Sequence, residues 1–250
     1  MIKGFLYDWE NNILLERQKL DVDFYFQIIR KYDMGSNILE LGCGTGRITY
    51  PLSLKGMHIT GIDISKEMLE VANIKDQTTN SNYIFGDMRF LNYKQEFDVA
   101  IVPYNTFMLL STDHFRKQCL ETLCRSLRIC GYAFVDISCN FLSKTEGYRC
   151  KAEGYCDEVN SYVKLYESTQ QNYKRQITTI TKTYVLTNHP DIVVKEEWYT
   201  LKENEMKWLL KDTGFEIEEI YGTYCGDTLY KGEVYDDRSY KNIYLLKKDS

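Results

Sequence analysis

The chain has 250 residues, of which 44% are hydrophobic and 27% are charged, and its formal net charge is −5. These values are ordinary for a globular enzyme, and the acidic balance argues against general affinity for nucleic-acid backbones or anionic membranes. No apolar run reaches membrane-spanning length, and the N-terminus has no signal-peptide core. Because the eight cysteines form no Cys-x-x-Cys pair and only three histidines accompany them, we expect a reduced cytoplasmic protein without a metal site.

The first 35 residues are expected to begin with an irregular piece and to continue as a helix from about Asp21 to Arg30. Beyond Gly35, apolar runs alternate with helical patterns. The expected strands cover 37–41, 58–63, 83–85, 97–102 and 132–137, and the expected helices cover 47–55, 66–74 and 113–128, with Ser65 as an N-cap. This alternation predicts a parallel sheet covered by helices on both faces.

The pattern changes between about residues 139 and 199. Three segments rich in Thr, Val, Ile and Tyr, at 161–169, 176–186 and 192–199, predict an antiparallel meander inserted after the fifth strand. A capping box at Thr200-Leu201-Lys202-Glu203 then predicts a helix to about Lys211, with Gly214 as its stop. Strands at 215–221 and 240–247 complete the expected sheet.

Residues 38–47 carry the most informative motif, Ile-Leu-Glu-Leu-Gly-Cys-Gly-Thr-Gly-Arg. An apolar run leads into Gly42, Gly44 and Gly46, and the chain then becomes helical. Glycines allow a tight turn against which a ligand lies, and the first turn of the helix offers unpaired N–H groups. Asp63 ends the next apolar run, 21 residues after Gly42, where a carboxylate accepts hydrogen bonds from ribose hydroxyls.

Two details argue against a dinucleotide ligand. The spacing is Gly-x-Gly-x-Gly rather than Gly-x-Gly-x-x-Gly, and Glu40 precedes the first glycine by two residues. A carboxylate there repels a pyrophosphate but suits a ligand that carries an amine and a sulfonium. The glycines alone are also compatible with a simple tight turn, which the presence of both Glu40 and Asp63 disfavours. The stretch closely resembles the first two motifs of the class I S-adenosylmethionine-dependent methyltransferases.

The resemblance implies an α/β fold: a Rossmann-like seven-stranded sheet, mostly parallel, with the last strand antiparallel and beside the sixth. Residues 36–138 and 200–250 would form this domain. Residues 1–35 would be an N-terminal helical segment closing over the cofactor, and residues 139–199 an antiparallel β lid. The implied activity is methyl transfer from S-adenosyl-L-methionine, which leaves S-adenosyl-L-homocysteine.

The resemblance also implies the residues that hold the cofactor. Asp87 and the backbone of Met88 follow the third strand and would bind the adenine, although an ordinary turn aspartate is the alternative. Arg17 would bind the methionine carboxylate, with a solvated surface arginine as the alternative. The expected cofactor contacts are Arg17, Glu40, Gly42, Cys43, Gly44, Gly46, Asp63, Ile64, Asp87, Met88, Val102 and Pro103.

The layout is most similar to the deoxyaminosugar and glycine N-methyltransferases, which share the β insertion and a Tyr-Thr-x-x-Glu opening of the late helix, here at 199–203. The stretch Ile101-Val102-Pro103-Tyr104 lacks the Asn or Asp that precedes Pro-Pro-Tyr in enzymes that methylate amino groups of nucleic acids and proteins. We therefore expect a small-molecule acceptor. A tRNA or protein methyltransferase and a non-catalytic cofactor-binding protein are the alternatives, and the accepting atom is left open.

Candidates for a general base are Tyr7, Tyr104 and His114, each of which is also explained by packing or surface exposure. The acceptor pocket is expected to include Tyr7, Tyr104, Asn105, Phe107 and Trp198, with aromatic side chains of the inserted sheet forming much of its wall. The inserted sheet would line this pocket or form a homodimer interface, and the sequence leaves both open.

Overall fold

The parallel sheet predicted from the alternating pattern is present in the computed structural model, which describes residues 1–14, 19–138, 145–201, 203–225 and 241–249. Its strand order is β10-β11-β5-β4-β1-β2-β3, and β11 runs antiparallel to both neighbours. The Rossmann-like seven-stranded fold is thereby confirmed. The strands are β1 Asn37–Leu41, β2 His58–Asp63, β3 Ser81–Phe85, β4 Phe97–Val102, β5 Leu127–Ser138, β10 Phe215–Tyr221 and β11 Lys241–Lys248.

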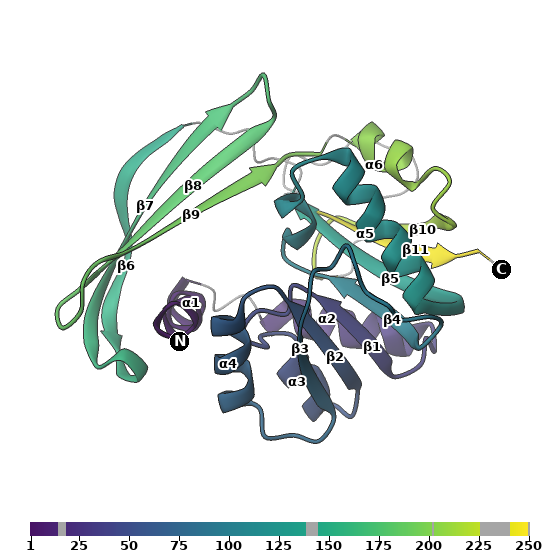
Figure 1. The fold of residues 1–250 in the computed structure, drawn as a ribbon, viewed down its shortest axis with the longest axis horizontal. Coiled ribbons are helices and arrows are strands. Elements are labelled where there is room, and N and C mark those ends of the chain that lie inside the picture. Colours follow the sequence, from purple (N-terminus) through teal and green to yellow (C-terminus); the bar gives the residue numbers. More distant parts are fainter. Residues whose placement is uncertain (15–18, 139–144, 202, 226–240, 250) are drawn as a thin grey trace.

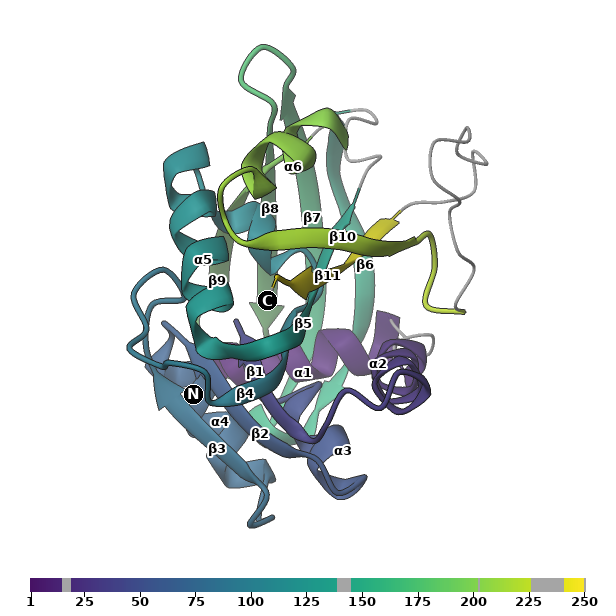
Figure 2. The same ribbon diagram turned by 90° about the vertical axis from the view of Figure 1, so that its right-hand side faces the viewer.

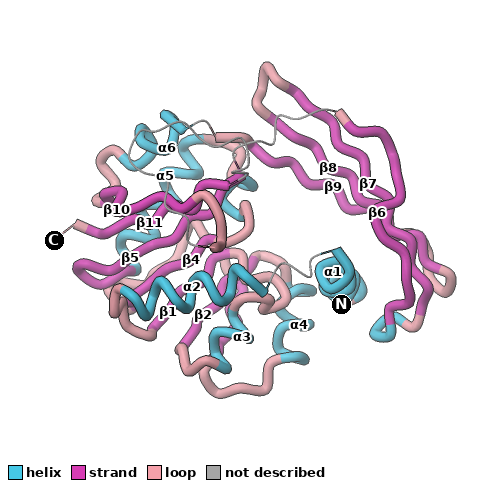
Figure 3. The backbone as a smooth tube through the Cα atoms, turned by 180° about the vertical axis from the view of Figure 1, so that it is seen from behind, coloured by secondary structure: helices cyan, strands magenta, loops and turns pink. Residues whose placement is uncertain are grey.

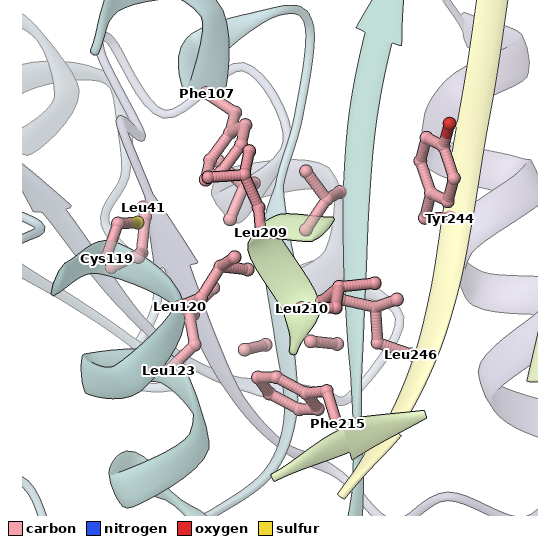
Figure 4. Packing of buried hydrophobic residues seen from close by; sticks show 14 of the residues in the cluster. Leu41, Phe107, Cys119, Leu120, Leu123, Leu209, Leu210, Phe215, Tyr244 and Leu246 are labelled. Atoms are coloured by element: carbon pink, nitrogen blue, oxygen red, sulfur yellow. The ribbon is translucent and has the colours of Figure 1, made fainter. Parts of the chain in front are cut away.

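Alternate residues of the central strands enter two different cores, one on each face of the sheet. In β4, Ala100 and Val102 face the core beneath α5 and α6, while Val99 and Ile101 face the core beneath α2 and α3. Figure 2 shows α5 and α6 on one side of the strands and α2 on the other, and Figure 4 shows leucines of α5 and α6 packed together. The helices are α2 Lys19–Lys31, α3 Thr49–Leu54, α4 Lys66–Lys75, α5 Asp113–Ser126 and α6 Glu203–Leu210.

Two predicted helix boundaries have different outcomes. Ser65 is the N-cap of α4, as predicted, and its side chain accepts a hydrogen bond from the Met68 N–H at 3.4 Å. The late helix begins at Glu203 rather than at Thr200. Its predicted capping box falls partly on residue 202 and on the Glu203 side chain, which lie outside the described part of the chain.

The inserted sheet has four antiparallel strands rather than the three predicted: β6 Glu146–Cys156, β7 Ser161–Asn172, β8 Ile177–Leu186 and β9 Ile192–Tyr199. The missed strand, β6, is an edge strand that contains two glycines and two register irregularities in its pairing with β7. These features weaken the strand signal in the sequence. The sheet stands beside the parallel sheet and curves around the N-terminal helix (Figure 1).

The N-terminus is also more regular than predicted, because helix α1 spans Ile2–Leu14. Its Leu6 and Trp9 are buried against apolar residues of the inserted sheet. At Gly4, an added Cβ would lie 2.8 Å from a methyl carbon of Val71 in α4, so this glycine allows close helix packing. Figure 3 shows α1 between the inserted sheet and α4. Within the described residues, no helix has the length and apolar character needed to cross a membrane.

Candidate active site

The glycine turn after β1 faces a cavity at the carboxyl edge of the parallel sheet. Gly42, Gly44 and Gly46 all have positive φ, at +73°, +55° and +79°. A Cβ on Gly42 would lie 2.3 Å from Thr106 Cγ2, whereas a Cβ on Gly44 would meet no atom within 4 Å. Gly44 therefore leaves an open space beside the main chain, where a ligand can lie against the backbone.

The cavity has a volume of about 740 Å³ and lies between the two sheets. One wall, here called the parallel-sheet wall, consists of the glycine turn and the carboxyl ends of β1, β2 and β4. The other, the inserted-sheet wall, consists of side chains from β6 to β9 together with α1. A cavity at the carboxyl ends of parallel strands is the expected ligand site of such a sheet.

Asp63 joins the glycine turn to the start of α4. Its Oδ2 atom accepts a hydrogen bond from the Gly44 N–H at 2.8 Å, and its Oδ1 atom accepts one from the Ser65 N–H at 2.8 Å. Burial raises the pKa of the Asp63 carboxyl, and these N–H donors oppose the rise. The carboxylate is thus held at the cavity edge in a defined orientation.

Glu40 is a buried carboxyl group in the parallel-sheet wall, with only 2% of its surface exposed. Its Oε2 atom accepts a hydrogen bond from the Thr49 hydroxyl. Burial raises the pKa of Glu40 from 4.5 to about 8. The hydrogen bond from Thr49 and the nearby Arg47 both lower this pKa, but their effect is smaller than that of burial. A cationic group placed in the cavity would favour ionisation of Glu40.

Arg47 follows the glycine turn and was not among the predicted site residues. Its Nη1 atom lies 2.6 Å from Oδ2 of the buried Asp21 in α2, and its guanidinium lies 5.2 Å from the centre of the Tyr104 ring. Arg47 also lines the cavity. No local sequence signal indicates this pairing, because Asp21 lies 26 residues earlier, on helix α2.

The turn after β4 presents Tyr104 to the cavity. Tyr104 and Asn105 both have positive φ, at +50° and +64°. The Asp136 carboxylate accepts a hydrogen bond from the Tyr104 N–H at 3.2 Å, and the Asn105 side chain accepts one from the Ser138 N–H at 2.7 Å. Lys241 lies 5.1 Å from the centre of the Tyr104 ring. These contacts hold a sparsely populated backbone conformation in place.

The inserted-sheet wall carries charged groups that the sequence analysis also missed. Glu10 of α1 accepts hydrogen bonds from Lys182 Nζ at 2.7 Å and from the Tyr184 hydroxyl at 2.5 Å. On β9, the Trp198 indole N–H donates to Glu196 Oε2 at 3.1 Å. The period-2 alternation of β8 and β9 places Lys182, Glu196 and Trp198 on the inward face.

Helix α1, which belongs to the inserted-sheet wall, contacts both the glycine turn and the strands of the inserted sheet. Asp8 Oδ1 accepts a hydrogen bond from the hydroxyl of Thr45 in the glycine turn at 2.5 Å, and Asp8 Oδ2 pairs with Lys75 of α4 at 2.5 Å. Two residues later, Glu10 binds the inserted sheet through Lys182. The helix therefore connects the glycine turn to strand β8 of the inserted sheet.

The structure gathers most of the predicted site residues around one cavity. Those that line it are Tyr7, Glu40, Gly42, Cys43, Gly44, Asp63, Pro103, Tyr104, Asn105 and Trp198. The predicted residues that do not line it are Gly46, Ile64, Asp87, Met88, Val102, Phe107 and His114. Arg17 lies outside the described residues.

Three of these residues have surroundings that differ from those expected. Phe107 is fully buried, because the short helix Thr106–Leu109 turns its ring into the core (Figure 4). His114 is exposed in the first turn of α5, away from the cavity lining. The Asp87 carboxylate pairs with Arg89, 2.5 Å from its Nη2 atom. In the part of the chain that is described, no three His, Cys, Asp or Glu residues are grouped so as to hold a metal ion.

Comparison with known proteins agrees with the fold and with the glycine motif. The family described as "Methyltransferase domain" matches residues 38–131, which include the glycine turn and Asp63. The cypemycin N-terminal methyltransferase of Streptomyces sp is 25% identical over 214 residues, which cover 86% of this chain and 84% of that protein.

Solved structures extend the similarity over the whole chain. An S-adenosylmethionine-dependent methyltransferase from Clostridium acetobutylicum superposes with a TM-score of 0.80 at 19% identity, covering 100% of this chain and 99% of that one. The sugar N-methyltransferase KedS8 from Streptoalloteichus sp has a TM-score of 0.77 at 13% identity, covering 98% and 93%. Residues 38–131 of the chain therefore match a methyltransferase domain, and the whole chain has the fold of S-adenosylmethionine-dependent methyltransferases.

Proposed function

We propose that this methyltransferase methylates the nitrogen of a small, polar amine. The observation that carries the proposal is the charge of the inserted-sheet wall. Among the described residues, its charged side chains are four glutamates and two lysines, which leave a net charge of −2: Glu10, Glu146, Glu167, Glu196, Lys151 and Lys182. An amine becomes positively charged when it gains a methyl group, so a negative wall stabilises the product charge and repels carboxylate or phosphate acceptors.

The parallel-sheet wall fits the cofactor. The open space beside Gly44 leaves room for a ligand against the main chain. The Asp63 carboxylate at the cavity edge would accept hydrogen bonds from the ribose hydroxyls, and the Glu40 carboxylate would attract the positively charged amine and sulfonium of the cofactor. When bound, S-adenosylmethionine would supply the methyl group: the nitrogen lone pair would form the C–N bond, the C–S electron pair would stay on sulfur, and the positive charge would pass to nitrogen. Gly42, Cys43 and Pro103 line the same wall, where they would contact the cofactor.

Tyr7 and Tyr104 serve this reaction as orienting groups rather than as bases. Removal from water raises the pKa of the Tyr104 hydroxyl to about 12 and raises the pKa of Tyr7 as well. Both hydroxyls therefore stay protonated at neutral pH. They line the cavity together with Trp198 and would exclude water, and the amine would lose its proton to solvent before it binds.

The names of similar proteins support nitrogen as the accepting atom. They include an N-terminal methyltransferase and a sugar N-methyltransferase, both of which align over most of the chain. A malonyl-[acyl-carrier protein] O-methyltransferase of Bacillus anthracis is 33% identical, but the match covers 45% of that protein. A malonyl group carries a free carboxylate, and the acidic wall of this chain disfavours a carboxylate acceptor.

Methyl transfer from cofactor labelled in its methyl group tests the proposal. The acceptors are D-glucosamine, a dipeptide with a free amino terminus, their N-acetylated forms, a catechol and a malonyl thioester. We expect label on an amine and none on its N-acetylated form. Label on the catechol or the thioester alone would overturn the choice of nitrogen, and intact cofactor binding without any transfer would favour a non-catalytic binding protein.

Replacing Asp63 by Ala should weaken S-adenosylmethionine binding. The change removes the expected ribose acceptor together with the hydrogen bonds to the Gly44 and Ser65 N–H groups. We expect a loss of about 1–3 kcal/mol of binding free energy, with the parallel sheet still folded. Calorimetric titration measures the affinity and circular dichroism checks the fold. Unchanged affinity in the folded variant would contradict the role of Asp63.

Cofactor affinity should rise with pH towards about 8. Glu40 holds its proton up to a pKa of about 8 in the folded protein, so binding of a cationic ligand beside it at lower pH releases that proton. Below pH 8 the affinity should fall by at most about tenfold per pH unit. The same shift makes Glu40 contribute less to folding stability as pH rises from 4.5 to 8, since the unfolded chain ionises this group first.

Glu40→Gln serves as the control for this pH dependence, because the amino group of the cofactor also titrates near pH 8. Calorimetric titration at pH 6.5, 7.5 and 8.5 should show a steeper rise in affinity for the wild type than for the variant. Equal slopes in the two proteins would show that the proton released on binding does not come from Glu40.

A further inference from the structure

We infer that the Glu196 carboxylate on β9 is the group that receives the acceptor nitrogen. The inference rests on the proposed N-methyltransferase function and adds the residue that selects the acceptor.

The register of the inserted sheet places Glu196 on the inward face of β9. It lies opposite Ile180 of β8, which in turn lies opposite Thr169 of β7, and all three residues line the cavity. Trp198 follows two residues later on the same face and donates its indole N–H to Glu196 Oε2 at 3.1 Å. One carboxylate oxygen is thus fixed, and the other is left to accept a hydrogen bond from a ligand.

The charges around Glu196 are not balanced by the chain. Lys182 is the nearby cation, but its ammonium is bound by Glu10 at 2.7 Å. Within the described ranges, no Lys or Arg lies in ion-pair distance of Glu196. One lysine therefore faces two carboxylates, and one negative charge remains unbalanced in the cavity.

The position of Glu196 also brings it near the parallel-sheet wall. Strand β9 packs against the short helix Thr106–Leu109, which directly follows Tyr104 and Asn105. The charges of Glu10 and Lys182 both act on the Tyr104 hydroxyl, so this acidic group of residues and Tyr104 face the same part of the cavity. An amine held by Glu196 would lie between the two walls.

The chemistry of amine methylation explains why a carboxylate belongs there. A neutral amine donates an N–H hydrogen bond to the carboxylate, which orients its lone pair. As the C–N bond forms, the nitrogen becomes positively charged, and the fixed negative charge stabilises it more than the neutral reactant. Glu196 would therefore favour acceptors whose reacting atom ends as an ammonium.

The test compares Glu196→Gln with Glu197→Gln. Glu197 is the next residue on β9 but is exposed on the opposite face, where it pairs with Lys195 at 3.4 Å and accepts a hydrogen bond from Tyr199. Both variants lose one negative charge from the same strand, and only the first loses it from the cavity. The protein is saturated with S-adenosylhomocysteine, and ligand binding is followed by saturation-transfer NMR.

The probes are propylamine, D-glucosamine and alanyl-alanine amide, with propanol, D-glucose and the N-acetylated dipeptide amide as neutral counterparts. We expect at least one amine to bind the wild type more tightly than its counterpart. Glu196→Gln should lower the affinity for that amine by roughly tenfold, which is the effect of losing one charge-assisted hydrogen bond. The affinity for the neutral counterpart should stay unchanged. Glu197→Gln should keep the preference. Three outcomes would overturn the inference. The wild type shows no preference for amines, Glu196→Gln keeps the preference, or Glu197→Gln loses it to the same extent as Glu196→Gln.

A kinetic measurement separates this inference from the proposed function. For an amine that accepts the label, Glu196→Gln should lower kcat/KM while the calorimetric affinity for the cofactor stays at the wild-type value. If the wild type methylates only oxygen acceptors, the proposed function falls, whereas the amine preference at Glu196 is still measured by NMR. Unchanged kcat/KM in Glu196→Gln would overturn the role of Glu196 even where the enzyme is an N-methyltransferase.

Discussion

Gly44→Val is expected to abolish measurable S-adenosylmethionine binding while the protein remains folded. A Cβ at this position would meet no protein atom within 4 Å, so the branched side chain would occupy the space that a ligand needs. The φ of +55° adds strain of about 1–2 kcal/mol for a residue with a side chain. We expect the affinity measured by calorimetry to fall by more than about 100-fold, equivalent to some 2.7 kcal/mol or more.

Gly56→Val is the matched control for this variant. Gly56 has a φ of +85°, and its Cβ would also meet no atom within 4 Å, but the residue lies in the turn between α3 and β2 and does not line the cavity. Thermal unfolding should show similar destabilisation in both variants, and only Gly44→Val should lose the cofactor. Normal affinity in Gly44→Val would mean that the glycine turn has a purely structural role.

Asp21→Asn should lower the free energy of unfolding by about 3–5 kcal/mol, because it leaves the Arg47 charge without its partner in a poorly hydrated place. The Asp21 side chain is fully buried, and that of Arg47 is 16% exposed. Asparagine still accepts the hydrogen bond from the Val22 N–H, so the change removes mainly the charge. Urea denaturation followed by circular dichroism measures the loss.

Asp23→Asn tests whether this effect comes from burial. Asp23 lies two residues later in the same helix and pairs with Lys55 at 3.0 Å, but its side chain is 53% exposed. An exposed pair of this kind contributes less than about 1 kcal/mol. If Asp21→Asn were as mild as Asp23→Asn, Arg47 would not depend on Asp21 for its charge balance.

The parallel sheet could be predicted well because its signals are local. Strands β1, β2 and β4 have the predicted bounds, since each is a short apolar run that ends at a glycine, an acid or a proline. Helix α1 was wrongly expected to be irregular, because a glycine and two adjacent asparagines mask a helix that depends on burial of Leu6 and Trp9. Tertiary packing here outweighs local preference.

The residues of the candidate site likewise include some that local sequence signals identify and others that only the fold brings together. The glycine turn and Asp63 are close in sequence and have characteristic spacing, so they could be recognised. Glu10 and Lys182 are 172 residues apart, and only the folded chain brings them together. The cytoplasmic location, the domain boundaries and the homodimer interface stay predictions, and so does the acceptor.

The contacts of α1 have a consequence for how this enzyme could be recombined with its relatives. Asp8 holds the glycine turn, and Glu10 holds the inserted sheet, on one short helix at the start of the chain. The inserted sheet therefore cannot be exchanged on its own. If a sheet from another methyltransferase replaced Lys182, Glu10 would lose its ion-pair partner. A working chimera has to exchange the first helix and the sheet as a pair, although more than 100 residues of the shared scaffold separate them.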